Sequence, residues 1–247
     1  MPKSYILCTN FAGPCSPSSL ELGHILDNPF DPAPVPRNAD CRVPIPASDI
    51  SPPLVEAGFT ATRAELVSGE GEGGSGAPGL LVGLLRGVDA HSEGGEEEGD
   101  GGGLVRIEKL ETAEFEPSAA YVLQSVAGRS VRDDVEGREG QAVLYMVTGI
   151  KVARGVSIGR AGNGTVRWSE PMDLVLAIRV CKVCVDEWDV DTRHAGEDGK
   201  AMSGGGGGEG RRTVEVGGDL TMKDLEVMLG EEYSVIEDAK EGIRWIA

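Results

Sequence analysis

Residues 141–185 decide the fold, and they read QAVLYMVTGIKVARGVSIGRAGNGTVRWSEPMDLVLAIRVCKVCV. Valine, isoleucine and leucine dominate two runs, Gln141–Arg160 and Met172–Val185, and a long run rich in β-branched residues favours a strand. The residues between the runs include Gly162-Asn163-Gly164, which is typical of a hairpin turn. The sequence therefore predicts one long β-hairpin, which we call the second hairpin.

A first hairpin is expected upstream of it. Gly79–Asp89 is apolar and has the length of a strand, and Leu104–Leu110 alternates apolar and charged residues, which is the period of a half-exposed strand. The acidic, glycine-rich tract Ser92–Gly103 lies between these two runs. We therefore expect a first hairpin that pairs residues 80–91 with residues 104–112.

Smaller elements are expected before and between the hairpins. We predict a strand over residues 4–11, one or two helical turns over Leu20–Leu26 inside a proline-rich stretch, and a strand or short helix over 58–68. Glu116-Pro117 opens a helix, because proline fits the first helical position. Apolar residues recur at helical spacing after it, which indicates a face packed on the core: Ala119, Val122, Leu123, Val126 and Ala127.

The sequence after the second hairpin predicts three further elements. They are a short strand over residues 213–216, an amphipathic helix over 221–229 with Thr221 as its N-cap, and a terminal apolar run, Ile243–Ile246. We divide the chain into a main domain, residues 1–210, and a short C-terminal tail, residues 211–247. The tail is expected either to cap the main domain or to belong to it.

Composition excludes several classes of protein. Of 247 residues, 23 are Lys or Arg and 41 are Asp or Glu, and the net charge of −18 argues against a nucleic-acid-binding protein. No apolar run approaches the ~20 residues of a membrane-spanning helix, and the N-terminus lacks a signal-peptide pattern. Five cysteines, an odd number, favour reduced thiols. We expect a cytoplasmic protein.

No residue pattern supports an enzyme. Cys181 and Cys184 have the spacing of a metal or redox pair, but a zinc site needs two further ligands at short spacing, and strand geometry places these two on opposite faces. The three histidines, His24, His91 and His194, form no recognisable catalytic set. The glycine tracts lack the lysine of a phosphate-binding loop. We expect no cofactor, no metal and no enzymatic activity.

Basic residues gather in the second hairpin although the chain is strongly acidic. Only Glu170 and Asp173 are acidic between Gln141 and Val185. The basic residues there are Lys151, Arg154, Arg160, Arg167, Arg179 and Lys182. A locally cationic segment is attracted to an acidic lipid surface. These six side chains are therefore candidate contacts for acidic phospholipid.

The first strand of the second hairpin is expected to be amphipathic. Strict alternation places Ile150, Val152, Val156 and Ile158 on one face, interrupted by Arg154, and small or polar residues on the other. This pattern is typical of a strand in a membrane barrel, but also of a half-buried strand in a soluble protein. Both interpretations stay open on the pattern alone.

Several stretches, in order, resemble the pore-forming domain of gasdermins. Residues 144–155 (LYMVTGIKVARG) and 173–183 (DLVLAIRVCKV) are similar to the central hairpin of that family. Residues 22–30 (LGHILDNPF), 44–46 (PIP) and 114–118 (EFEPS) are similar to segments of fungal gasdermin-like cell-death proteins. The resemblance covers residues 4 to about 190, and its weight comes from the order of several individually weak matches.

The resemblance implies an α+β fold, with a twisted, mostly antiparallel sheet, surrounding helices and two long hairpins that can insert into a membrane. The second hairpin would pair residues 142–160 with 171–186. Many copies would form a ring on an acidic plasma membrane, alone or with a divergent related chain, and the pore would execute regulated cell death. The apolar residues implied to enter the membrane are Leu81, Leu84, Val105, Ile107, Ile150, Val152, Val156, Ile158, Leu174, Leu176 and Ile178.

The chain departs from the gasdermin pattern in three respects. It lacks room for the large C-terminal repressor domain of animal gasdermins, and Lys3 is the lone early cation where that family usually carries a basic helix. The overall charge of −18 also opposes adsorption to acidic bilayers. The alternative function is a soluble, β-rich module that binds another protein without perforating membranes.

Overall fold

The computed structural model describes residues 3–8, 17, 19–31, 34–62, 104–136, 142–162, 165–185, 214–229, 233, 235–238 and 243–246. Ten strands and three helices lie within these ranges. The strands are β1 (Lys3–Leu7), β2 (Ile25–Leu26), β3 (Leu54–Thr62), β4 (Leu104–Glu114), β5 (Ala142–Gly162), β6 (Thr165–Trp168), β7 (Met172–Val185), β8 (Val214–Asp219), β9 (Val235–Asp238) and β10 (Ile243–Ile246). The helices are α3 (Ala119–Val126), α4 (Arg129–Glu136) and α5 (Met222–Leu229).

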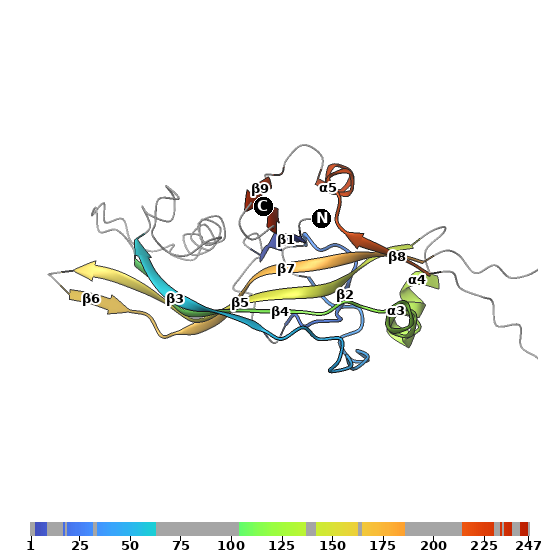
Figure 1. Ribbon diagram of the computed structural model, residues 1–247, viewed down its shortest axis with the longest axis horizontal. Coiled ribbons are helices and arrows are strands. Elements are labelled where there is room, and N and C mark those ends of the chain that lie inside the picture. The colour runs from blue at the N-terminus through green and yellow to red at the C-terminus, as the bar shows by residue number, and fades with distance from the viewer. Residues whose placement is uncertain are drawn as a thin grey trace, which may run out of the picture.

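The strands form one curled, mostly antiparallel sheet. The strand order is β3-β4-β5-β7-β1-β10-β9, while β2 and β6 pair with β5, and β8 pairs with β7. Every pairing is antiparallel except that of β1 with β10. The expected mixed fold with a mostly antiparallel sheet is thus confirmed, with α3 and α4 at one end of the sheet and α5 near the C-terminus (Figure 1).

The second hairpin is present as predicted. β5 pairs antiparallel with β7 from Ala142–Val185 to Val156–Met172, and beyond that point β5 continues into a pairing with β6. The paired residues 59–62, 104–107, 156–162 and 165–168 form a projection that we call the arm. Figure 1 shows β3, β5 and β6 extending away from α3 and α4.

The predicted alternation along β5 is wrong beyond Ala153. The β5–β7 register shifts between Ala153 and Val156, where β5 has one residue more than β7, and Gly155 adopts a φ of 62°. Such a bulge moves every following side chain to the other face. Ile150 and Val152 therefore pack in one core cluster, whereas Val156 packs in another with Ala153.

The partner predicted for residues 104–112 is also wrong. β4 pairs with β3 along one edge, from Thr62–Leu104 to Leu54–Thr112, and with β5 along the other. Both edges of β4 are thus occupied, and neither neighbour is the segment 80–91. That segment, with Leu81 and Leu84, lies outside the described residues. The first hairpin of the structure is therefore made of β3 and β4.

The helical turns expected over Leu20–Leu26 are absent, because this segment forms turns and the short strand β2. Gly23 has a φ of 80°, which is left-handed backbone, and a Cβ there would lie 2.4 Å from Oη of Tyr121. The Gly23 N–H donates to the carbonyl of Val147, and the Val147 N–H donates back to that of His24. Docking onto β5 thus replaces the helix.

The other predicted elements are confirmed with shifted ends. β1 and β8 lie where strands were expected, and α3 and α5 lie where helices were expected. β3 overlaps the segment for which a strand or a short helix was expected. Thr221 caps α5, since its Oγ1 accepts from the Asp224 N–H at 3.2 Å while the Asp224 carboxylate accepts from the Thr221 N–H at 2.9 Å. Reciprocal bonds of this kind fix where a helix begins.

The C-terminal residues form part of the same core. Leu220 and Leu225 pack with Val180 and Ile178 of β7, and Trp245 packs with Tyr5 of β1. Strand β8 pairs with β7, and β10 lies between β1 and β9 in the sheet. The described part of the tail therefore contributes strands and buried side chains to the sheet that the rest of the chain builds.

Acid is expected to destabilise the fold through His24. This side chain is buried, and its Nδ1 accepts from the Glu21 N–H at 3.0 Å. Burial, assisted by the Arg42 charge, lowers the pKa of His24 in the folded chain. The unfolded chain then takes up the proton first, so stability is fully present above about pH 6.5 and declines as the pH falls toward the folded pKa.

Urea unfolding at about pH 7.5 and about pH 5.5 measures this effect. The H24Q variant should lose less stability between these pH values than the wild type does. H91Q is the control, because it removes one histidine elsewhere in the sequence. Equal pH dependence in H24Q and H91Q would rule out His24 as the responsible group.

Candidate functional site

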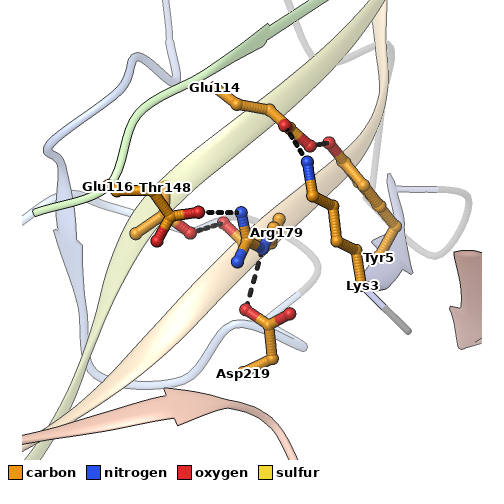
Figure 2. Close-up of polar contacts among 7 residues, drawn as sticks. All are labelled: Lys3, Tyr5, Glu114, Glu116, Thr148, Arg179 and Asp219. Atoms are coloured by element: carbon orange, nitrogen blue, oxygen red, sulfur yellow. Dashed lines mark hydrogen bonds and ion pairs between the residues drawn. The ribbon is translucent and has the colours of Figure 1, made fainter. Parts of the chain in front are cut away.

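Two adjacent groups of hydrogen-bonded polar side chains lie in the middle of the sheet, and together we call them the central polar network. Its members come from β1, β4, β5, β7 and β8 and from Glu116, two residues after the end of β4 (Figure 2). They are Lys3, Tyr5, Glu114, Glu116, Thr148, Arg179 and Asp219. The network joins the N-terminal strand, both hairpins and the C-terminal segment.

Glu114 holds the N-terminal strand across the sheet. Lys3 and the Tyr5 hydroxyl both donate to its carboxylate. In strand order β5 and β7 lie between β4 and β1, so these bonds require the sheet to curl. Burial alone would raise the pKa of Glu114, but the bonds from Lys3 and Tyr5 outweigh it and lower the pKa. Burial and the bond to Glu114 raise the pKa of Tyr5, which stays protonated.

Arg179 is the second centre of the network. This guanidinium is only 8% exposed, and it donates through Nη1 to Glu116 at 2.9 Å and through Nε to Asp219 at 2.8 Å. Its backbone carbonyl accepts from the Thr148 hydroxyl at 3.4 Å. Asp219 is itself mostly buried, whereas Glu116 is largely exposed. Arg179 therefore links β7 to β8 through a mostly buried ion pair with Asp219, and to the end of β4 through an ion pair with the exposed Glu116.

Gly149 brings the two centres together. A Cβ at this position would lie 3.0 Å from both Cβ of Arg179 and Oη of Tyr5, and 3.4 Å from Cγ of Glu114. The β5–β7 register also shifts between Val147 and Gly149. The missing side chain thus provides the space in which groups from β1, β4 and β7 approach one another.

Lys151 is buried beside the network. The side chain is 5% exposed, and its Nζ lies 5.4 Å from the ring centre of Tyr5 and 5.3 Å from that of Trp245. A cation between two aromatic rings is stabilised by their negative faces. One residue of β5 thereby contacts both β1 and β10, which carry the two ends of the described chain.

The other candidate lipid contacts are placed as follows. Arg154 donates to Glu111 at 2.7 Å and to Asp173 at 2.8 Å, and Lys182 donates to Asp224 at 2.8 Å. Arg167 is exposed, and the side chain of Arg160 lies outside the described residues. With Lys151 and Arg179, four of the six candidate cations thus have partners within the protein, and Arg154 and Lys182 remain about one third exposed.

The ion pair between Lys182 and Asp224 remains charged well into acid. Burial alone would raise the pKa of Asp224, but hydrogen bonds from Lys182 and Thr221 outweigh it and lower the pKa to about 2. The sequence pattern did not reveal these pairs, because each carboxylate comes from a segment distant in the chain. Asp224 is 42 residues from Lys182, and Asp219 is 40 residues from Arg179.

Most of the candidate membrane-inserting residues that the structure describes are buried. Those that are buried in the core are Val105, Ile107, Ile150, Val152, Val156, Leu176 and Ile178. Ile158 and Leu174 are half-buried. Insertion of these side chains into a bilayer would therefore require their present contacts to be broken first.

The end of the arm carries exposed apolar side chains that sequence analysis did not single out. Val166 is 39% exposed and Trp168 37%. The Arg106 guanidinium lies 6.0 Å from the centre of the Trp168 ring, and a Cβ at Gly159 would lie 3.0 Å from that ring. Trp168 thus lies close to both an arginine of β4 and a glycine of β5. We call Val166, Arg167 and Trp168 the arm tip.

No protein-family model matches the chain, and no curated protein matches it. Within the described ranges, no group of three or more His, Cys, Asp or Glu side chains is arranged to hold a metal ion. In the same ranges, no helix combines the length and apolar character needed to cross a bilayer.

Proposed function

We propose that this chain is a gasdermin-like pore-forming protein, which assembles as a ring on acidic phospholipid membranes and executes regulated cell death. The observation that carries the proposal is the set of long, adjacent strands of the two hairpins. β4 has 11 residues, β5 has 21 and β7 has 14, whereas about 9–11 residues suffice for a strand to cross a bilayer. Strands in lipid must belong to a closed barrel, so several copies are needed.

The folded chain is then the soluble form of the protein, and its strands must rearrange before it can form a pore. Most of the described apolar side chains of β5 and β7 are buried, and Arg154, Arg179 and Lys182 are paired within the chain. The cytoplasmic monomer would bind the plasma membrane and then release these contacts. The ring would consist of identical copies or include a divergent related chain, and no enzymatic step is needed.

A soluble interaction module is the second candidate. The internal pairing of four hairpin cations favours it, because those side chains then serve stability within a folded globule. Such a module would bind a protein partner through its exposed edge strand β3, where Leu54 and Val55 are more than half exposed. It would leave every membrane intact.

Dye release from vesicles separates the two functions. Purified full-length chain is added to vesicles that contain acidic phospholipid and to vesicles of phosphatidylcholine alone. The pore-forming function predicts release from the acidic vesicles, together with rings on them in negative-stain images. Retained dye at every lipid composition, with and without a related chain, would leave the interaction module as the better interpretation.

The arm tip is expected to make the first contact with the membrane. Tryptophan favours the lipid–water interface, and a basic residue near an acidic surface contributes about 1 kcal/mol. Replacing exposed Arg167 with glutamine should therefore weaken binding to acidic vesicles about fivefold in a sedimentation assay. R129Q, on exposed α4, is the matched control and should bind as the wild type does. Equal binding by R167Q and R129Q would place the contact elsewhere.

A further inference from the structure

Three separate parts of the C-terminal segment each contact one cation of the second hairpin. Asp219 at the end of β8 pairs with Arg179, and Asp224 in α5 pairs with Lys182. Trp245 in β10 covers Lys151, as its ring centre lies 5.3 Å from Nζ. Half of the six cations predicted to bind lipid are thus engaged by residues 214–246.

These contacts hold β7 from both of its faces. Arg179 and Lys182 are three residues apart on one strand, so their side chains point to opposite sides of the sheet. On the Lys182 side, α5 buries Leu225 against Val180 and Ile178. On the Arg179 side, Asp219 joins the central polar network (Figure 2). The segment therefore encloses β7 near the end of the second hairpin that lies farthest from the arm.

β8 of this segment and the N-terminal strand β1 together occupy the edge of β7 that faces away from β5. β8 pairs with residues 181–185 of β7, and β1, which is itself held by β10, pairs with residues 177–178. Backbone N–H and C=O groups at that edge are therefore already paired. A neighbouring subunit can add its strand there only after β1 and β8 have left, because a strand edge accepts one partner at a time.

We propose that residues 214–246 are an intramolecular lock, which keeps the second hairpin in its soluble arrangement through the Asp219–Arg179 and Asp224–Lys182 ion pairs. Opening this lock, rather than removing a separate repressor domain, frees both the cations of β7 and the part of its edge that β8 occupies. The gating role of the lock rests on the proposed function. Its contacts with β7 do not.

The first test removes the two carboxylates in the full-length chain. D219N/D224N should speed amide hydrogen exchange in residues 214–229 at least tenfold without lipid, and should speed dye release from acidic vesicles. E21Q/D27N is the matched control, because it also removes two carboxylates, each from an arginine partner, but outside residues 214–246. The control should exchange and release dye at wild-type rates.

Each outcome of this test decides one point. Unchanged exchange in D219N/D224N overturns the lock, because the ion pairs then hold nothing. Faster exchange without faster dye release overturns its gating role, provided that the wild type releases dye. If no chain releases dye from any vesicle, the proposed function itself fails, and gating fails with it.

A covalent version of the lock provides an independent test. Cys184 on β7 lies directly opposite Glu215 on β8, so E215C can form a disulfide across the pair. Oxidised E215C should release no dye from acidic vesicles, and reduction should restore release to the wild-type rate. C184S/E215C, treated with the same oxidant, should remain active. Equal release by the oxidised and reduced E215C chains would overturn the proposal.

Discussion

Replacing Trp245 with alanine is expected to lower the free energy of unfolding by about 3–5 kcal/mol, the usual cost of truncating a buried tryptophan. Trp245 is 2% exposed, lies against Tyr5 with ring centres 5.7 Å apart, and covers the buried ammonium of Lys151. Its loss removes apolar contacts and also leaves a buried cation with one aromatic partner instead of two. Since small proteins have about 5–15 kcal/mol of total stability, much of the variant is expected to unfold or aggregate.

Urea unfolding followed by far-UV circular dichroism measures this loss. W245F keeps a ring over Lys151 and should recover most of the stability. V227A is the control for a substitution in the same segment, because Val227 is 80% exposed, and it should change stability by less than about 0.5 kcal/mol. A W245A chain as stable as V227A would show that β10 is dispensable for the fold.

Replacing Arg179 with methionine is expected to destabilise the chain by about 3 kcal/mol, because it leaves the carboxylate of Asp219 mostly buried without its partner. Glu116 contributes little to this cost, since its side chain is 74% exposed and regains water. Methionine keeps the unbranched stem, so the change isolates the charge. Thermal and urea unfolding of the purified variant measure the difference.

Arg154 provides the matched control for this prediction. It also bridges two carboxylates, Glu111 and Asp173, but its side chain is 32% exposed compared with 10% for Arg179. R154M should therefore cost about 1 kcal/mol or less, as exposed ion pairs do. Equal destabilisation by R154M and R179M would show that burial does not determine the strength of these pairs.

Local sequence patterns predicted the elements whose signals are complete within a few residues. Glu116-Pro117 predicted the start of α3 two residues early, because the N-cap is Ser118 and the helix begins at Ala119. Thr221 with Asp224 marked the start of α5, since capping bonds join neighbours in the chain. The second hairpin followed from two long runs of β-branched residues and the glycine-rich turn between them. In each case the residues that gave the signal are neighbours in the chain and lie in or next to the element that they predicted.

The missed features depend on residues that are far apart in the sequence. Whether 104–112 pairs with 54–62 or 80–91 depends on which segment completes the sheet, and both are apolar enough to be strands. A bulge at Gly155 reversed the face of Val156, although alternation alone gives no sign of an extra residue. The central polar network was missed because no local pattern relates Glu114 to Lys3 or Arg179 to Asp219.

The parallel pairing of β1 with β10 has a consequence for synthesis of the chain in the cell. Lys3 pairs with Ile243, so 243 − 3 = 240 residues separate the partners. At about 5–20 residues per second, a ribosome needs about 12–48 s to translate that stretch. Throughout this interval the nascent Ser4–Leu7 segment, all of whose side chains are buried in the finished fold, lacks its partner β10. Chaperones that bind short apolar segments are therefore expected to shield the N-terminus until translation has passed residue 246.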